Sequence, residues 1–328
     1  MAAVRVDEIR PEPGVVVNPD GGSLASRALL LACQGVVGPF VRHYPVTPLT
    51  MPLARIVVDG LSALRPMPRG IEREQVRLQG FRMEIIRPAG ARRALRDGVV
   101  MYLHGGGFFL GGLDSHRPIA AAIARRTGLA VVNVEYRQLP GTPIAGSVRD
   151  CLTAYRWLLR HGADAGRIVF AGDSAGGYLS FATALRAVES GLPAPAGLVG
   201  LSPLLDLDCA AKREYANVRR DPYIPLTGLA KVVEYGGEGQ VSPVDGALGT
   251  LPPALLIVGE DELLRYDCEL MARRLTAAGV PNSLELWRGQ VHAFMSIAPS
   301  MPESRVVLGR VARFVRARIE AEAAARTA

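Results

Sequence analysis

The run Ile168-Val169-Phe170-Ala171-Gly172-Asp173-Ser174-Ala175-Gly176-Gly177, continued by Tyr178 to Leu185, decides the fold. An apolar, β-branched run that leads into an alanine- and leucine-rich stretch predicts a strand followed by a helix. Between them lies Gly-x-Ser-x-Gly, whose small residues let the two backbones pass closely. We expect strained dihedral angles at Ser174, whose hydroxyl then stands at a helix N-terminus, where amides and the helix dipole favour negative charge.

A glycine run follows a second predicted strand, upstream in the chain. Val99 to Leu103 is apolar throughout, and His104-Gly105-Gly106-Gly107 comes directly after it. Glycines at a strand end allow a loop to present successive N–H groups outward, unblocked by Cβ atoms. No Gly-Lys-Ser/Thr follows, which disfavours a phosphate-binding loop. We therefore predict that amides of Gly105, Gly106 and Gly107, together with the Ala175 amide, form an oxyanion hole.

A nucleophilic serine needs a base, and the base needs an orienting acid. Of the five histidines, only His292 lies C-terminal to Ser174, in a loop after the short predicted strand Leu284 to Trp287. Its position and uniqueness make it the candidate base. In the chain order serine, acid, histidine, the acid follows the preceding strand, Ala254 to Val258. Three carboxylates compete there: Glu260, Asp261 and Glu262.

Three motifs together give the chain a family resemblance. His104-Gly-Gly-Gly, Gly172-Asp-Ser-Ala-Gly-Gly and Val291-His292-Ala-Phe294 resemble the bacterial hormone-sensitive-lipase-like (family IV) carboxylesterases and lipases of the α/β-hydrolase superfamily. The similarity runs from about residue 75 to about residue 320. It implies a serine hydrolase with Ser174 as nucleophile, His292 as base, and the glycine and Ala175 amides as oxyanion hole, with no cofactor and no metal.

The sequence departs from the family pattern at the acid and at one loop. The family's Asp-x-Leu-x-Asp, registered on Leu256 to Arg265, puts Glu262 at the acid position and Tyr266 at the second aspartate. Asp261 is the alternative acid if the loop is shifted by one residue. The family's Leu-Ala-Pro-Glu is Gln138 to Gly141 here, so a carboxylate that braces the active-site loops is missing.

The resemblance implies an α/β-hydrolase fold with a central, mostly parallel sheet of about eight strands flanked by helices. A helical cap is expected from the N-terminus and from an insertion. We divide the chain into a cap segment at 1–70, core at 71–205, an insertion for cap and acyl pocket at 206–249, and core at 250–328. Candidates for lining the acyl pocket are Tyr215, Tyr223, Ile224 and Leu229.

Local patterns extend this outline. An antiparallel hairpin is predicted for Val76–Leu78 and Phe81–Ile86, with Gln79-Gly80 between them. A helix is predicted for Pro118 to Thr127.

Two apolar segments, Leu24 to Val41 and Pro45 to Leu64, precede the core. The first is short and glycine-interrupted for a membrane span. One interpretation is a cap with an apolar inner face packed on the core. The other is a surface, residues 24–64, that makes peripheral contact with a membrane or lipid surface. Met1 to Pro19 lacks the apolar stretch of a secretion signal.

Composition bounds the class of protein. With 328 residues, 49% of them hydrophobic, the chain is long enough for one α/β domain plus an appendage. The net charge of +7 comes almost wholly from arginine, and no nucleic-acid-binding motif is present. The four cysteines, Cys33, Cys151, Cys209 and Cys268, lack metal-binding spacing, which favours free thiols in a reducing compartment. We predict a cytoplasmic protein, with membrane association and a homodimer left open.

The predicted activity is hydrolysis of carboxylic esters through an acyl-enzyme, on short- to medium-chain acyl esters or lipids. Three alternatives stay open: a lipase acting on long-chain glycerides, an amidase or acyltransferase with the same triad, and a non-catalytic small-molecule receptor. The predicted partner is a small-molecule ester or lipid substrate, and no nucleic acid.

Overall fold

The computed structural model describes residues 15–18, 21–91 and 94–327. Its nine described strands form one sheet in the order β1-β9-β8-β7-β6-β4-β5-β3-β2. Only the β2–β3 and β3–β5 pairings are antiparallel. The strands are β1 (Val15–Val17), β2 (Ile71–Leu78), β3 (Phe81–Pro88), β4 (Val99–Leu103), β5 (Ala130–Glu135), β6 (Ile168–Asp173), β7 (Gly197–Leu201), β8 (Ala254–Gly259) and β9 (Asn282–Trp287).

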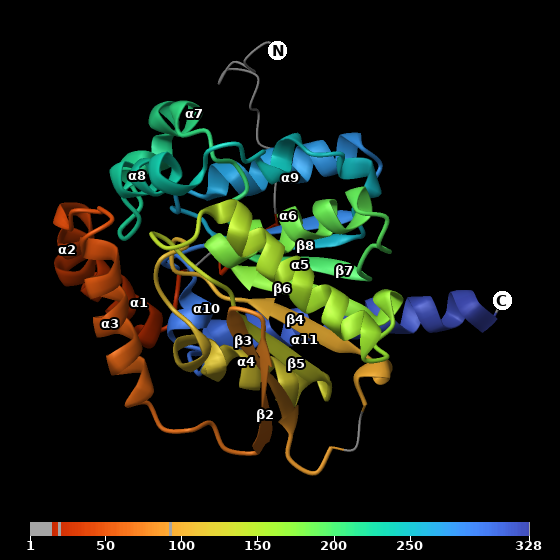
Figure 1. Ribbon diagram of the computed structural model, residues 1–328. Coiled ribbons are helices and arrows are strands. Elements are labelled where there is room, and N and C mark those ends of the chain that lie inside the picture. The colour runs from red at the N-terminus through yellow and green to blue at the C-terminus, as the bar shows by residue number, and fades with distance from the viewer. Residues whose placement is uncertain (1–14, 19–20, 92–93, 328) are drawn as a thin grey trace.

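Helices cover both faces of this sheet (Figure 1). Side chains of β4 alternate between the two hydrophobic cores, with Met101 on one side and Val100 and Tyr102 on the other. The first core also holds residues of α5, α6 and α9, and the second holds residues of α4 and α11. These helices are α4 (Leu113–Thr127), α5 (Ile144–Arg160), α6 (Ala175–Glu189), α9 (Arg265–Ala277) and α11 (Pro302–Thr327), with the short α10 (Phe294–Ile297) before α11.

The mostly parallel sheet predicted from the sequence is confirmed, and so is the hairpin between β2 and β3. Gln79 and Gly80 form its two-residue turn, and Gly80 has a positive φ of 87°. The ninth strand, β1, was not predicted; it is three residues long and pairs in parallel with β9. Helix α4 begins at Leu113 rather than at Pro118, so this proline lies inside the helix, where it forfeits the one hydrogen bond that an N–H at this position would donate to the Asp114 carbonyl.

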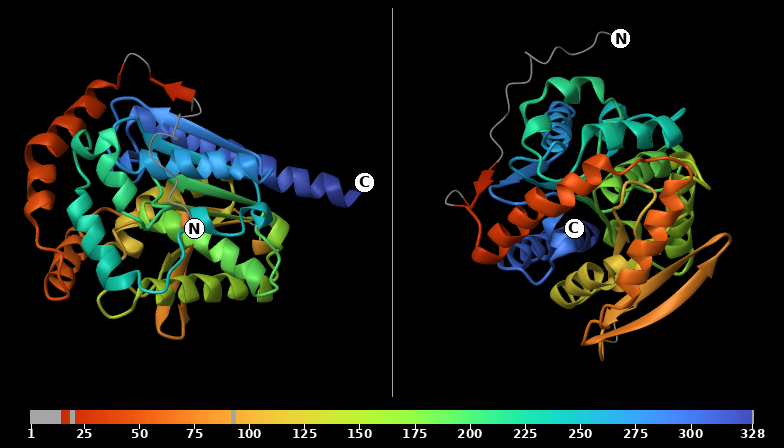
Figure 2. Two further views of the ribbon diagram at one scale, coloured as in Figure 1. Left: turned by 90° about the horizontal axis from the view of Figure 1, so that it is seen from above. Right: turned by 90° about the vertical axis from the view of Figure 1, so that its left-hand side faces the viewer.

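The N-terminal helices and the insertion lie together at one side of the molecule (Figures 1 and 2). The first group is α1 (Leu24–Ala32), a π-helical segment (Cys33–Val37), α2 (Gly38–His43) and α3 (Thr50–Ala63), and the insertion carries α7 (Ala210–Glu214) and α8 (Leu226–Gly236). Gly38 makes their close contact, since a Cβ there would lie 2.1 Å from the carbonyl oxygen of Pro222. The division of the chain into segments stays a prediction.

The orientation of the N-terminal helices corrects the expectation of an apolar inner face. Ser26, Cys33 and Ser62 are buried against the body of the protein. Large apolar side chains point the other way, with Phe40 at 67% and Leu53 at 61% exposure. The side that packs inward is therefore small and polar apart from Met51, which is fully buried in the first core. By length and composition alone, Leu24–His43 is also apolar enough to cross a membrane.

Helix α6 approaches strand β4 so closely that only glycine fits at Gly176. A Cβ at this position would lie 1.9 Å from the carbonyl oxygen of Leu103. We predict that Gly176→Ala lowers the free energy of unfolding by about 3 kcal/mol, the upper end of overpacking costs. Gly309→Ala is the matched control, because a Cβ there meets no atom within 4 Å. Urea unfolding measures both, and a Gly176→Ala protein as stable as the control would contradict the packing.

Candidate active site

Ser174 sits in a strained turn between β6 and α6. Its φ is 52° and its ψ is −119°, values that a non-glycine residue rarely adopts and that cost about 1–3 kcal/mol. The neighbouring backbone holds it there: the Ser174 N–H donates to Leu201 O at 3.0 Å, and its carbonyl accepts from the Leu204 N–H at 3.0 Å. The Ser174 hydroxyl makes no hydrogen bond within the described part of the chain. It is therefore available to a substrate.

His292 and Glu262 form a buried pair. His292 Nδ1 lies 2.7 Å from Glu262 Oε2. The other carboxylate oxygen, Oε1, accepts from the Ser202 hydroxyl at 2.7 Å and from the Gly259 N–H at 2.6 Å. Ser202 in turn accepts the N–H of Ala293 at 3.1 Å. This hydroxyl thus ties the carboxylate to the backbone beside the imidazole and fixes the orientation of both.

The electrostatics of the pair favour a basic imidazole. Burial alone would lower the pKa of His292, but the adjacent Glu262 carboxylate outweighs it and raises this pKa above 6.5. Since Nδ1 faces the carboxylate, the opposite nitrogen, Nε2, is the one left to exchange a proton. No described residue hydrogen-bonds to that nitrogen.

The other two carboxylates of the β8–α9 loop point elsewhere. The Asp261 side chain is 48% exposed and lies 3.8 Å from Arg220. Glu260 pairs with Arg288 at 2.8 Å, and this hydrogen bond lowers the pKa of Glu260. Of the three competitors, only Glu262 contacts His292. The motif register that favoured Glu262 agrees with this geometry.

Sheet topology brings the triad candidates to one edge. Ser174 follows β6, Glu262 follows β8 and His292 follows β9, and these strands lie in the order β9-β8-β7-β6. All run in parallel, so their carboxyl ends share one edge, where such folds place their sites. From the insertion, Tyr223 places its ring 6.0 Å from the His292 ring. Tyr215 instead donates to Glu269 of α9.

The glycine loop after β4 corrects one expectation. The Gly105 N–H donates to Asp173 Oδ1 at 3.1 Å, so it is already engaged and cannot serve an oxyanion. The N–H groups of Gly106 and Gly107 meet no acceptor among the described residues. Both residues have positive φ, 113° and 60°, which turns the loop. The amides that remain are those of Gly106, Gly107 and Ala175.

Asp173 anchors this loop, a role that the sequence analysis missed. Its carboxylate accepts from the Tyr102 hydroxyl at 2.6 Å and from Gly105, and it lies 3.4 Å from His116 Nε2. Burial opposes ionisation, yet the neighbouring His116 and the hydrogen bonds bring the pKa of Asp173 to about 2. Its place next to Ser174 in the Gly-Asp-Ser motif was the available signal.

His104 buttresses the loop as a neutral ring. Burial, with His116 nearby, lowers its pKa to about 3. Its Nδ1 hydrogen-bonds to Gly105 O at 2.8 Å, and the ring stacks on Tyr136 with centroids 4.3 Å apart. The family's bracing carboxylate is missing at Gly141, but Gln138 of the same motif contacts the loop, since its Nε2 donates to Gly111 O at 3.0 Å. The loop therefore keeps a brace of a different kind.

A buried ion pair holds the insertion against α9. Lys212 is fully buried, and its Nζ lies 3.0 Å from Asp267 and 3.9 Å from Asp206. Asp267 also accepts the N–H groups of Leu205 and Asp206. Burial raises the pKa of Asp267 to about 6.

Within the described residues, no group of three His, Cys, Asp or Glu side chains is placed to hold a metal ion.

We predict that Asp173→Asn lowers kcat on a soluble ester roughly tenfold to a hundredfold, below the loss expected from deleting an oxyanion donor. The variant keeps the volume of the side chain but loses the charge that holds the Gly105 amide. KM should change less than kcat, because the effect falls on the oxyanion loop. Steady-state kinetics beside a thermal melt measure this, and an unchanged kcat in a folded variant would contradict the anchoring role.

Comparisons with known proteins agree with this architecture. A family profile described as alpha/beta hydrolase fold matches residues 100–296. The carboxylesterase/phospholipase LipF of Mycobacterium tuberculosis is 33% identical over 317 residues, which cover 92% of this chain and 84% of that protein. An acetyl-hydrolase of Streptomyces hygroscopicus is 34% identical over 232 residues, 69% of this chain and 78% of that protein.

A solved structure, that of an esterase from the bacterial hormone-sensitive lipase family, superimposes with a TM-score of 0.80 at 32% identity. The match covers 90% of this chain and 99% of that chain. The likeness thus extends over most of the chain.

Proposed function

The chain belongs to the α/β-hydrolase fold family, in its bacterial hormone-sensitive-lipase-like branch, and we propose that Ser174, His292 and Glu262 are its catalytic triad. The protein is a carboxylic ester hydrolase. The observation that carries the triad is the 2.7 Å contact between His292 and the buried Glu262, at the strand edge that also bears Ser174.

The proposed reaction is acyl transfer in two steps. Ser174 Oγ attacks the ester carbonyl carbon while His292 Nε2 takes the hydroxyl proton. The amides of Gly106, Gly107 and Ala175 stabilise the oxyanion of the tetrahedral intermediate. The C–O bond to the leaving group then breaks, and the imidazolium protonates the departing alcohol. Water repeats the sequence on the acyl-enzyme, which releases the carboxylic acid and restores Ser174.

Glu262 acts through His292 rather than on the substrate. Its carboxylate keeps the proton of the neutral ring on Nδ1, which leaves Nε2 as the acceptor for the serine proton. It also stabilises the imidazolium that forms during attack. The hydrogen bonds from Ser202 and Gly259 hold the carboxylate in place, so it need not reorganise as the charge develops.

We propose short- to medium-chain acyl esters as substrates. The support is the names of two similar proteins: one is called an acetyl-hydrolase and the other a carboxylesterase/phospholipase. We also infer a reducing compartment, the cytoplasm, because all four cysteines are free thiols.

The first test is a set of initial rates on p-nitrophenyl esters from acetyl to palmitoyl, for the wild type and for Ser174→Ala. We expect turnover to vanish in the variant at every chain length, with an unchanged unfolding curve, and a wild-type optimum at short to medium chains. Retained turnover in Ser174→Ala would reject the nucleophile, and an optimum at palmitoyl would reject the chain-length proposal in favour of a lipase.

The pH profile of kcat/KM tests the acid. Activity should rise with pH through the pKa of His292, which lies above 6.5 because Glu262 stabilises the imidazolium. Glu262→Gln removes the nearest negative charge that raises the pKa of His292, so this acid limb should move to lower pH and kcat should fall by roughly 10²–10⁴.

Asp261→Asn serves as the matched control, because Asp261 neighbours Glu262 in sequence but faces solvent. Both the acid limb and kcat should stay at their wild-type values. A larger loss in Asp261→Asn than in Glu262→Gln would transfer the role of the acid to Asp261.

A further inference from the structure

Helix α3 carries its apolar stripe on the side away from the protein. Leu53, Ile56, Val57, Leu61 and Leu64 recur at spacings of three and four residues, and each is at least 59% exposed. A surface helix of a globular protein ordinarily turns such a stripe toward the core. In α3 only Met51, in the first turn, and the polar Ser62 are buried.

The segment from α1 to α2 has the same inverted arrangement. Ser26, Cys33 and Gly38 face the body of the protein, whereas Leu31, Val36 and Phe40 are each at least 67% exposed. In the right-hand view of Figure 2 these helices and α3 lie together across the side that faces the viewer. We call this side the N-terminal face; its exposed large apolar residues are Leu24, Leu31, Val36, Val37, Phe40, Leu49, Leu53, Ile56, Val57, Leu61 and Leu64.

The charged side chains of residues 24–70 are nearly all positive, whereas Asp114 and Glu135, from elements packed next to α3, lie near Asp59. Residues 24–70 contain five arginines and a single acid, Asp59, which is paired with Arg55 at 3.3 Å. Arg42, Arg65 and Arg69 are exposed and form no ion pair with any described residue. The N-terminal face therefore combines exposed hydrocarbon with three arginines that form no ion pair among the described residues.

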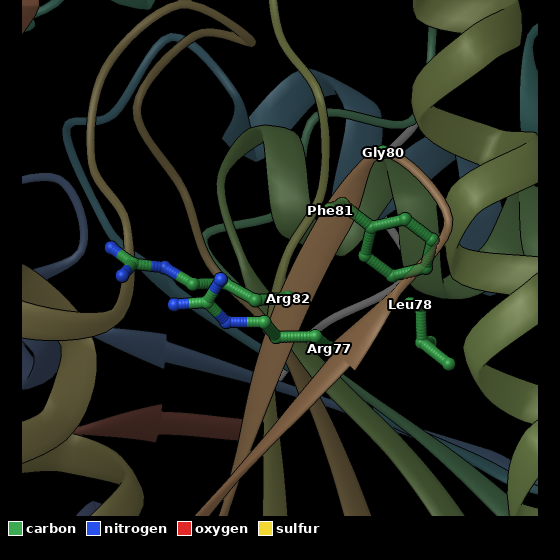
Figure 3. Close-up of a pocket in the computed structure, with 5 residues that line it drawn as sticks. All are labelled: Arg77, Leu78, Gly80, Phe81 and Arg82. Carbon is green, nitrogen blue, oxygen red and sulfur yellow. The ribbon is translucent and has the colours of Figure 1, made fainter.

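The tip of the β2–β3 hairpin extends the basic border. Arg77 and Arg82 face each other across the hairpin, and Figure 3 shows their side chains side by side, with Phe81 and Leu78 apart from them. Arg82 pairs with Glu135, but Arg77 has no ion pair among the described residues. A cavity that reaches from Arg82 to Arg55 places this tip beside α3.

We propose that the N-terminal face docks onto an anionic lipid surface, with α1, α2 and α3 lying in the plane of the interface. Apolar side chains would enter the acyl region while the arginines meet lipid phosphates, the arrangement of interfacial amphipathic helices. A second copy of the chain fits less well, because a two-fold interface would set the positive border of one copy against that of the other.

The N-terminal face lies close to the candidate active site. Gly38 of α2 packs on Pro222 of the insertion, and the neighbouring Tyr223 lies against His292. The docked surface is thus next to the segment that borders the active site. We infer that docking would place esters of the lipid surface near Ser174. This use of the docking rests on the proposed function, whereas the docking itself does not.

Vesicle co-sedimentation of the full chain tests the proposal. The probes are phosphatidylcholine vesicles with and without phosphatidylglycerol. We expect binding to the anionic vesicles, weaker by about tenfold or more in the triple variant Leu53→Ser, Ile56→Ser, Leu61→Ser. Arg42→Gln and Arg65→Gln should each weaken it about fivefold, as expected for one basic residue at an anionic surface.

Val241→Ser with Val306→Ser is the matched control, since both residues are exposed apolar side chains outside the N-terminal face. This variant should bind like the wild type. Turnover of soluble p-nitrophenyl acetate should be the same in all variants, which separates lost docking from lost folding and from failure of the proposed hydrolase.

Several outcomes would overturn the proposal. One is a wild type that stays in solution with either vesicle, whether as a monomer or as a dimer that the triple variant disrupts. Another is equal binding to neutral and anionic vesicles. A third is protein that alkaline carbonate cannot extract from the vesicles, since that would indicate a membrane-spanning helix rather than docking.

Discussion

The close approach of Gly176 to the carbonyl of Leu103 is the constraint on which the site depends. It brings the start of α6 against the end of β4, and so sets Ser174 and the glycine loop side by side. The strain at Ser174 persists because its N–H is bonded to the last residue of β7 and its carbonyl to the chain that follows β7. A turn held in this way fixes the hydroxyl before any substrate arrives.

Two buried carboxylates serve the two sides of that serine. Asp173 is held ionised and fastens the Gly105 amide, which leaves the next two amides of the loop unbonded. Glu262 fastens the imidazole of His292 and raises its pKa. One carboxylate therefore shapes the place where negative charge would develop, and the other supports the positive charge that would balance it. Both accept a hydrogen bond from a buried hydroxyl, Asp173 from Tyr102 and Glu262 from Ser202.

Much of this was predictable from sequence, because short-range patterns carry it. The strand, turn and helix around Ser174 are local, and the parallel sheet follows from alternating strands and helices. The donor role expected of Gly105 was wrong because the partner of its amide, Asp173, is distant in the chain. The prediction of an apolar inner face for the N-terminal helices was wrong for another reason. Apolar content gives the periodicity of a helix, but not which side meets the protein, and here Ser62 is buried while Leu61 is exposed.

The central claim is that Ser174, whose hydroxyl is presented by the strained turn and whose proton is taken by His292, is the nucleophile. Mass spectrometry after reaction with a fluorophosphonate tests it most directly, because the reagent phosphonylates an activated serine and stays attached. The account predicts a single adduct on the peptide that contains Ser174, formed with loss of ester hydrolysis. An adduct on another residue, or full inactivation with Ser174 unlabelled, would contradict it.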